Sequence, residues 1–120
     1  MSWKYFKKED FKCKCCDQNL IDDKLIDLLD ELRELVGFPL PVTSGYRCPE
    51  HNAKVSSTGL DGPHTTGKAA DLGVSRERAV KVLEVALKME FTGIGVNQKG
   101  EARFVHLDIV PRPSRTCWSY

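Results

Sequence analysis

Histidine is scarce in this chain of 120 residues, which contains only His51, His64 and His106. His64 stands in a loop after Gly62-Pro63, and Asp71 follows seven residues later. Gly67, Ala69 and Ala70 between them are small, so this segment can pack closely while the loop folds back and places an imidazole beside a carboxylate. Such a pair can hold one metal ion.

A second group of polar side chains stands on a predicted strand, Phe104-Val105-His106-Leu107-Asp108. Because side chains alternate along a strand, His106 and Asp108 project from the same face. If this strand lies beside the strand of Asp71, then His64, Asp71 and His106 converge as two nitrogens and one carboxylate oxygen. Three protein ligands leave a fourth position open for water, which is the arrangement of catalytic zinc. The alternative is that the triplet is accidental, since many chains of this size contain two histidines and an aspartate.

Hydrolysis at such a site needs a group that takes a proton from water and passes it to the leaving amine. Asp108 is the geometric candidate because it shares a face with His106. Asp108 can equally orient a histidine ligand through a hydrogen bond, and the spacing leaves both roles open. Glu101 is a second candidate base, although its position near a predicted hairpin loop is more typical of a solvated charge.

Two further polar residues precede the first candidate ligand. Arg47 follows a Ser-Gly-Tyr turn, and its planar fork can bind a carboxylate of a substrate or of the fold itself. Taken alone, it has the pattern of a surface arginine. His51 stands on a predicted short helix, where a hydrogen-bonded structural histidine is more common than a metal ligand.

The cysteines are five in number, and an odd number cannot pair completely within one chain: Cys13, Cys15, Cys16, Cys48 and Cys117. The first four could form a structural zinc site, but CxCC lacks the usual CxxC spacing. The same missing CxxC argues against redox catalysis. We expect reduced, packed thiols, and the sequence leaves their role and oxidation state open.

The charge balance excludes several classes of partner. With 18 Lys+Arg against 17 Asp+Glu, the formal charge of +1 provides no basic field for nucleic acid or anionic lipid. No apolar stretch approaches the ~20 residues that span a bilayer. The amino-terminal segment lacks the apolar core of a secretory signal. We therefore expect a monomer that is synthesised in the cytoplasm without a signal peptide and has no nucleic-acid or membrane partner.

Hydrophobic periodicity predicts helices and short strands within one domain that spans residues 1–120. The predicted helices cover residues 22–36, 49–53 and 75–89. The predicted strands cover residues 41–44, 67–72, 93–96 and 102–110, with a loop at 56–66 and a hairpin loop at 97–100. Pro111 and Pro113 prevent the tail from continuing a central strand. This order predicts an α+β fold in which a small, mostly antiparallel sheet packs with helices.

Three sequence blocks carry a family resemblance: SGYRCPEHN at residues 44–52, HTTGKAAD at residues 64–71 and FVHLD at residues 104–108. Together they resemble the zinc D-Ala-D-Ala carboxypeptidase family, which includes peptidoglycan endopeptidases and shares its fold with the Hedgehog signalling domain. The closing RTCWSY resembles the Arg-Thr-Trp ending of small, single-domain phage-type members. These blocks occur in the family's order over about the last two thirds of the chain.

The resemblance implies a Hedgehog/DD-peptidase-like fold and a zinc ion bound by His64, Asp71 and His106. It also implies that Arg47 holds the substrate or polarises its carbonyl. The expected function is zinc-dependent hydrolysis of an amide bond in peptidoglycan stem peptides, with zinc-activated water as the nucleophile. The expected substrate is either a terminal D-Ala-D-Ala bond, cut by a carboxypeptidase, or a cross-link, cut by an endopeptidase.

The chain departs from the family pattern at two positions. Many relatives carry Ser two residues before the first ligand, where this chain has Gly62. Several carry an acidic base three residues before the last ligand, where this chain has Arg103. Asp108 therefore receives the role of base only by geometry. The second departure supports an alternative function, a non-hydrolytic zinc-containing module that binds the cell wall or another protein.

The expected site of action is the bacterial cell wall. Without an export signal, a wall-degrading enzyme reaches the wall by other means, either after release through a holin pore or as a virion component. The phage-type resemblance agrees with both routes, so we expect a phage endolysin or a related prophage protein.

Overall fold

In the computed structural model of the chain, residues 3–16, 18–56 and 62–120 are described. Within them, five strands form one sheet in the order β1-β2-β4-β3-β5. The strands are Val42–Ser44 (β1), Ala69–Leu72 (β2), Gly93–Asn97 (β3), Phe104–Asp108 (β4) and Thr116–Ser119 (β5). Neighbouring strands are antiparallel, except that β5 runs parallel to β3. The predicted α+β fold with a mostly antiparallel sheet is thereby confirmed.

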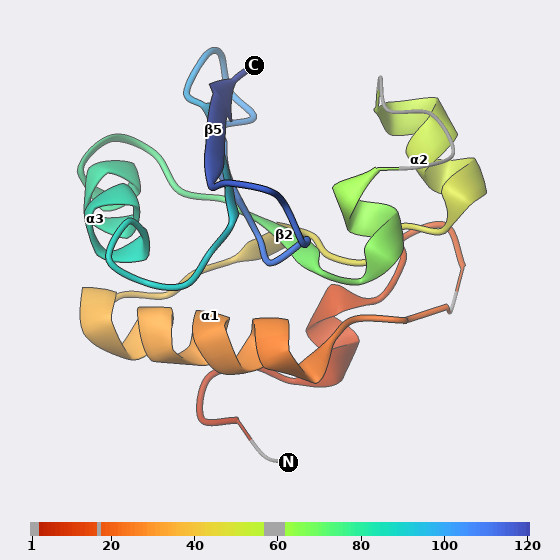
Figure 1. Cartoon of the computed structure of the whole chain (residues 1–120), viewed down its shortest axis with the longest axis horizontal. Coiled ribbons are helices and arrows are strands. Elements are labelled where there is room, and N and C mark those ends of the chain that lie inside the picture. Colours follow the sequence, from red (N-terminus) through yellow and green to blue (C-terminus); the bar gives the residue numbers. More distant parts are fainter. Residues whose placement is uncertain (1–2, 17, 57–61) are drawn as a thin grey trace.

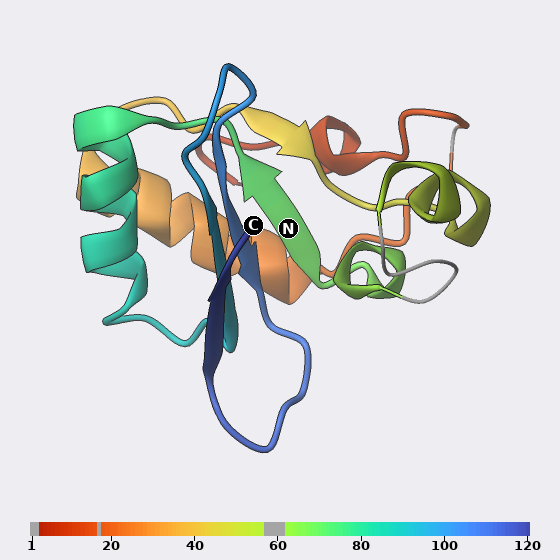
Figure 2. The same ribbon diagram turned by 90° about the horizontal axis from the view of Figure 1, so that it is seen from above.

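The helices surround this sheet. They are Asp23–Val36 (α1), Pro49–Val55 (α2) and Arg76–Ala86 (α3), with the 3-10 helices Lys8–Phe11 (η1) and Pro63–Thr66 (η2). Figure 1 shows α1 beneath the strands. Figure 2 shows the strands between α3 on one side and α2 with η2 on the other. No helix among the described residues has the length and hydrophobicity needed to cross a membrane.

The longest helix, α1, begins and ends at residues suited to these positions. The side chain of Asp22 caps it by accepting a hydrogen bond from the backbone N–H of Lys24. Gly37 ends it in the left-handed conformation, with φ of 81°. Its buried face consists of Leu25, Ile26, Leu29, Leu32 and Val36. This face forms the floor of the hydrophobic core under the sheet.

Strand alternation separates the core from the polar residues of β2 and β4. Ala70 and Leu72 of β2, with Val105 and Leu107 of β4, belong to the hydrophobic core. Asp71 and His106 stand at the alternate positions and are also buried, so both faces of this part of the sheet are covered. The two polar side chains are therefore held on a strand pair that is anchored from its other face.

Several element boundaries differ from the sequence prediction: α2 reaches Val55 where the prediction ended at residue 53, and the strand predicted at 102–110 covers only Phe104–Asp108. Helix α3 ends at Ala86, and residues 87–90 form turns, whereas the prediction extended the helix to residue 89. The predicted loop at 56–66 contains η2, which begins at Pro63 and ends where Gly67 adopts φ of 75°. Proline fixes φ for a first helical turn, and glycine accepts a positive φ at no steric cost, which explains both ends. Residues 57–61 of that predicted loop lie outside the described residues.

The sequence prediction did not include β5. Pro111 and Pro113 precede β5, and β5 lies at the edge of the sheet. The tail therefore does not form a central strand, as predicted. Gly95 of β3 pairs with Trp118 of β5 on one side and with His106 of β4 on the other. The carboxyl-terminal strand therefore brings an aromatic side chain to the polar face of the sheet.

Candidate metal centre

His64 is held in place by its position in η2. Its Nδ1 lies 2.7 Å from the carbonyl oxygen of Gly45, and its side chain is buried. A carbonyl only accepts hydrogen bonds, so Nδ1 must carry the proton and donate it. The other ring nitrogen, Nε2, is then left with a lone pair, and it lies 3.2 Å from Oδ1 of Asp71.

His106 approaches the same oxygen from the other side. It stands directly opposite Asp71 on the antiparallel pair β2 and β4. The two strands therefore lie side by side, which is the condition that the sequence analysis set for the triplet to converge. Its Nδ1 lies 3.0 Å from Oδ1 of Asp71, and its Nε2 lies 2.7 Å from Oδ2 of Asp108. The bond to Asp108 places the ring proton on Nε2 and leaves the lone pair of Nδ1 facing Asp71.

The three facing atoms have the chemistry of a cation site. When both imidazoles are neutral, two nitrogen lone pairs and a carboxylate oxygen meet with no proton between them, which is repulsive unless a cation lies there. Zinc bonds of 2.0–2.1 Å in a tetrahedron place donor atoms about 3.3 Å apart. The contacts of 3.0 and 3.2 Å are close to this spacing. Two nitrogens and one carboxylate oxygen are also a common catalytic zinc set, so these residues fit the ion.

The charges agree with this arrangement. Burial raises the pKa of Asp71, but the hydrogen bonds that protonated His106 and His64 would donate in place of a cation outweigh it and hold that pKa well below its usual range. Burial lowers the pKa of His106, but the hydrogen bonds that the protonated ring would donate to Asp108 and Asp71 outweigh it and raise that pKa above the usual value. The site therefore holds Asp71 as a carboxylate and favours positive charge beside it.

Asp108 occupies a position behind His106. It is fully buried, and its Oδ2 also accepts a hydrogen bond of 2.9 Å from Nη2 of Arg112. Its Oδ1 accepts from the backbone N–H of Val110 at 3.2 Å and from the hydroxyl of Thr92 at 3.3 Å. These contacts use both carboxylate oxygens, and Asp108 is not among the residues that line the adjacent cavity. Of the two roles open to Asp108, this geometry favours orienting His106 over acting as base.

Arg47 reaches the centre from the loop before α2. Its Nη2 lies 3.4 Å from Oδ2 of Asp71, the carboxylate oxygen that does not face the histidines. Its Nη1 donates to Oδ1 of Asn52 at 2.9 Å, and its Nε donates to Oγ of Ser44 at 3.0 Å. The fork is therefore fixed in one orientation at the edge of the centre, where its charge also stabilises Asp71.

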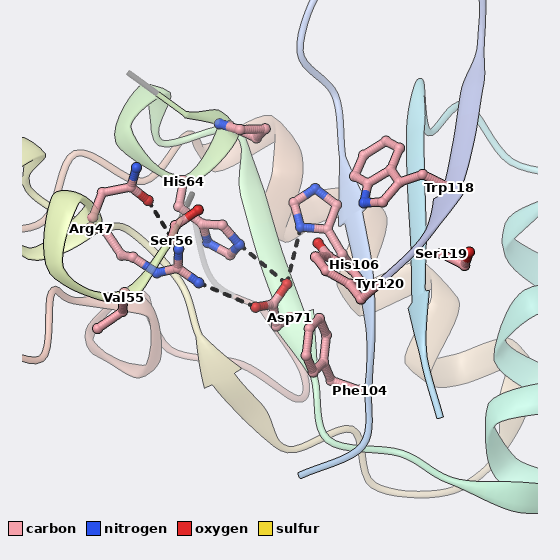
Figure 3. Close-up of a pocket in the computed structure, with 12 residues that line it drawn as sticks. Arg47, Val55, Ser56, His64, Asp71, Phe104, His106, Trp118, Ser119 and Tyr120 are labelled. Atoms are coloured by element: carbon pink, nitrogen blue, oxygen red, sulfur yellow. Dashed lines mark hydrogen bonds and ion pairs between the residues drawn. The ribbon is translucent and has the colours of Figure 1, made fainter. Parts of the chain in front are cut away.

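A cavity of about 540 Å³ opens onto these residues. Figure 3 shows His64 and His106 converging on Asp71, with Arg47 on one side and Trp118 and Tyr120 on the other. The ring of Trp118 packs at 5.1 Å from the ring of His106, measured between centroids. The other described lining residues are Asn52, Val55, Ser56, Pro63, Phe104 and Ser119. The donors therefore face an open, partly aromatic space that can admit a peptide.

Two other predicted candidates lie apart from this centre. Glu101 is exposed beyond the end of β3 and does not line the cavity, so its candidacy as base receives no geometric support. His51 is half-buried on α2 and likewise does not line it. Four of the five cysteines, in contrast, gather into a separate cluster at Cys13, Cys15, Cys16 and Cys48. Only Cys13 and Cys48 of these are buried, so the expectation of packed thiols holds for two of the four.

The sequence analysis missed three residues that shape the centre: Asn52, Arg112 and Trp118. Asn52 stands five residues after Arg47, and the bend into α2 brings the two side chains together. A spacing of five residues matches no helix or strand periodicity, so the sequence pattern does not predict this contact. Arg112 follows Asp108 by four residues. That spacing predicts an ion pair within a helix, but the proline-rich tail is not helical. The closing block that resembles the family was the only available indication of Trp118.

Comparison with known proteins places this geometry in a family. A family model described as Peptidase M15 matches residues 4–108, which include His64, Asp71 and His106 together with the cysteine cluster. A comparison with curated protein sequences gives no significant match. Peptidases of the M15 family are zinc-dependent, in agreement with a donor set that fits zinc. Because the match extends over most of the chain, this protein belongs to the peptidase M15 family of metallopeptidases.

Proposed function

We propose that this protein hydrolyses an amide bond in the stem peptides of peptidoglycan. The substrate is either a terminal D-Ala-D-Ala bond or a cross-link between stems. The observation that carries the proposal is the convergence of His64 Nε2, Asp71 Oδ1 and His106 Nδ1 at the floor of an open cavity. The family resemblance of the three sequence blocks supplies the substrate class.

His64, Asp71 and His106 would hold zinc. A bound zinc ion supplies a Lewis acid and lowers the pKa of a coordinated water. The protein's own contribution is to fix the donors in advance. The Gly45 carbonyl and the Asp108 carboxylate each accept the outward proton of one imidazole, so both rings present a lone pair to the site.

Arg47 would bind the substrate at the edge of this centre. Its guanidinium is mostly buried, already oriented by Ser44 and Asn52, and lines the cavity. A fixed cation there favours a carbonyl oxygen that gains negative charge during hydrolysis, or a carboxylate at the end of a stem peptide. Trp118 and Tyr120 form the opposite wall and can pack against the apolar side chains of the peptide.

The alternative of a non-hydrolytic module that binds the cell wall keeps one specific observation in its favour. Among the described residues that line the cavity, Asp71 is the only one with a carboxylate side chain, and it faces both histidines. If Asp108 were the base for hydrolysis, it would have to take the proton from a buried position behind His106, with Arg112 bound to it. A site that lacks an accessible base would bind a stem peptide and leave its amide bonds intact.

The test is incubation of the zinc-loaded protein with defined muropeptides, followed by mass analysis of the products. Release of a terminal alanine identifies a carboxypeptidase, and separation of linked stems identifies an endopeptidase. Activity should disappear with a chelator and return with zinc. Asp71→Ala should lose both the zinc of this site and activity, whereas Glu84→Gln, a change at an exposed pair on α3, should retain both. Zinc-dependent binding of muropeptides without any cleaved product would establish the alternative and refute hydrolysis.

A further inference from the structure

The cysteine cluster lies outside the cavity described above and has its own geometry. The Sγ atoms of Cys13, Cys15, Cys16 and Cys48 all lie within 4.8 Å of one another. Cys15 is central, with its Sγ 3.5 Å from that of Cys13 and 3.2 Å from that of Cys48. Four zinc–sulfur bonds of 2.3 Å in a tetrahedron place the sulfurs about 3.8 Å apart. The separations of 3.5 and 3.2 Å are shorter than this value and all four sulfurs lie within 4.8 Å of one another, so small side-chain movements suffice to enclose a metal.

We propose that these four cysteines bind a second zinc ion, which is structural. Four thiolates complete a tetrahedral set and leave no position for water, which is the arrangement of structural zinc sites. Thiolate sulfur selects soft or borderline metals over magnesium or calcium. The uncommon CxCC spacing is compatible with this site because Cys48 approaches from a distant part of the sequence and supplies the fourth sulfur.

The local backbone supports a thiolate centre. Cys13 and Cys48 are buried, and the backbone N–H of Cys48 points at Sγ of Cys13 over 3.4 Å. Such N–H groups stabilise negative charge on a ligating sulfur. Cys15 is exposed and Cys16 is half-buried, so an ion can enter from the solvent side.

The position of the cluster indicates what the second ion would stabilise. It would join the segment after η1 to Cys48, the residue that precedes α2. The loop between β1 and α2 supplies the Gly45 carbonyl to His64 and the side chain of Arg47 to Asp71. The backbone of Phe11 already contacts this loop, accepting a hydrogen bond of 2.7 Å from the N–H of Tyr46. A zinc ion at the cysteines would therefore fix the loop that positions one ligand and the arginine of the first centre.

Variants that remove one site at a time provide the test. Asp71→Ala removes a ligand of the first site only, so it should retain about one zinc ion per chain, against about two in the unaltered protein. Adding Cys15→Ser to Asp71→Ala should remove the remaining ion. Cys15 is exposed, so this change opens no cavity in the core. Cys117→Ser is the matched control, since Cys117 is an exposed cysteine of β5 outside the cluster, and it should leave the zinc content unchanged.

Cobalt provides a readout that does not depend on activity or on the first site. Asp71→Ala loaded with Co²⁺ under reducing conditions should show strong thiolate-to-cobalt charge-transfer absorption, which Cys15→Ser should abolish or sharply reduce. Absence of this absorption in Asp71→Ala, with all thiols reduced, would overturn the proposal. A disulfide within the cluster of the protein as purified, or iron in place of zinc, would overturn it as well. Because the variants separate the two centres, failure at the cysteines leaves the proposed peptidase site to be judged on its own results.

Discussion

The Nε2 of His106 lies 2.7 Å from Oδ2 of Asp108, and this contact fixes which ring nitrogen faces Asp71. Burial raises the pKa of Asp108, but hydrogen bonds from His106 and Arg112 outweigh it and lower that pKa below its usual value. Asp108 is therefore an anionic acceptor, and the proton of His106 stays on the side away from the candidate metal site. In this pair, Asp108 is buried against a candidate zinc ligand two residues away and does not line the cavity.

Asp108→Asn should weaken zinc binding by about 10- to 100-fold, because the neutral amide holds the imidazole proton less strongly. If Asp108 orients His106, activity should recover to within severalfold of the unaltered protein when zinc is saturating. The measurement is a zinc titration of activity and of metal content in parallel. If Asp108 is the base, activity at saturating zinc stays low, by a factor on the order of 10² to 10⁴.

Arg47→Lys should reduce kcat/KM by about 10- to 100-fold, while the zinc content stays near that of the unaltered protein. Lysine keeps the charge but cannot reproduce the fork that joins Ser44, Asn52 and Asp71. Loss of one charged hydrogen bond costs about 1.5–3 kcal/mol, which corresponds to this range. Arg103→Lys is the control, since Arg103 is a partly exposed residue that donates to a backbone carbonyl of the hairpin loop. Equal kinetics for both variants would remove Arg47 from the proposed substrate site.

Asp22 makes the stability of the fold depend on pH in a predictable direction. A hydrogen bond from Lys68 lowers its pKa below the ordinary 3.8, so the folded state binds this proton less readily than the unfolded chain does. The stabilisation is fully present above the unfolded pKa and is lost as the pH falls through the lower folded pKa. Asp22→Asn keeps the helix cap but loses the charge, so it should cost about 0.5 kcal/mol at pH 7 and nothing in strong acid.

Urea unfolding of Asp22→Asn and the unaltered protein over a pH series measures this difference. Asp22→Ala removes the cap of α1 as well, so it should cost about 1 kcal/mol more at neutral pH. A difference between Asp22→Asn and the unaltered protein that grows toward acid pH would contradict the assigned direction.

Gly95→Ala should disturb the aromatic wall of the cavity without removing a zinc ligand. A Cβ at this position would come within 2.6 Å of Nε1 of Trp118, closer than real contacts allow. The indole must therefore shift from its place beside His106, and a displacement of about 1 Å near the reacting groups can cost up to ~10²-fold in rate. We expect a lower kcat/KM at unchanged zinc content. Unchanged kinetics together with unchanged tryptophan fluorescence would show that Trp118 does not depend on Gly95.

The sequence by itself determined the local parts of this protein. Hydrophobic periodicity predicted the main helix over residues 22–36, strand alternation predicted the shared face of His106 and Asp108, and the scarcity of histidine limited the candidate ligands to a few residues. These features depend on neighbouring residues, and the physics that controls them acts over a few bonds. The three sequence blocks at residues 44–52, 64–71 and 104–108 indicated the family to which the chain belongs.

Only the tertiary structure decided the relations between distant segments. Cys48 lies close to Cys13 and Cys15 because the loop before α2 lies against η1. The CxCC spacing alone argued against a structural zinc site, but it could not show that Cys48 joins the cluster. Arg112 reaches Asp108 through an irregular proline-rich turn, and Trp118 reaches His106 through an edge strand. The contacts of Cys48 and of Trp118 depend on how the chain closes longer loops around one core, and residue spacing carries no record of that closure.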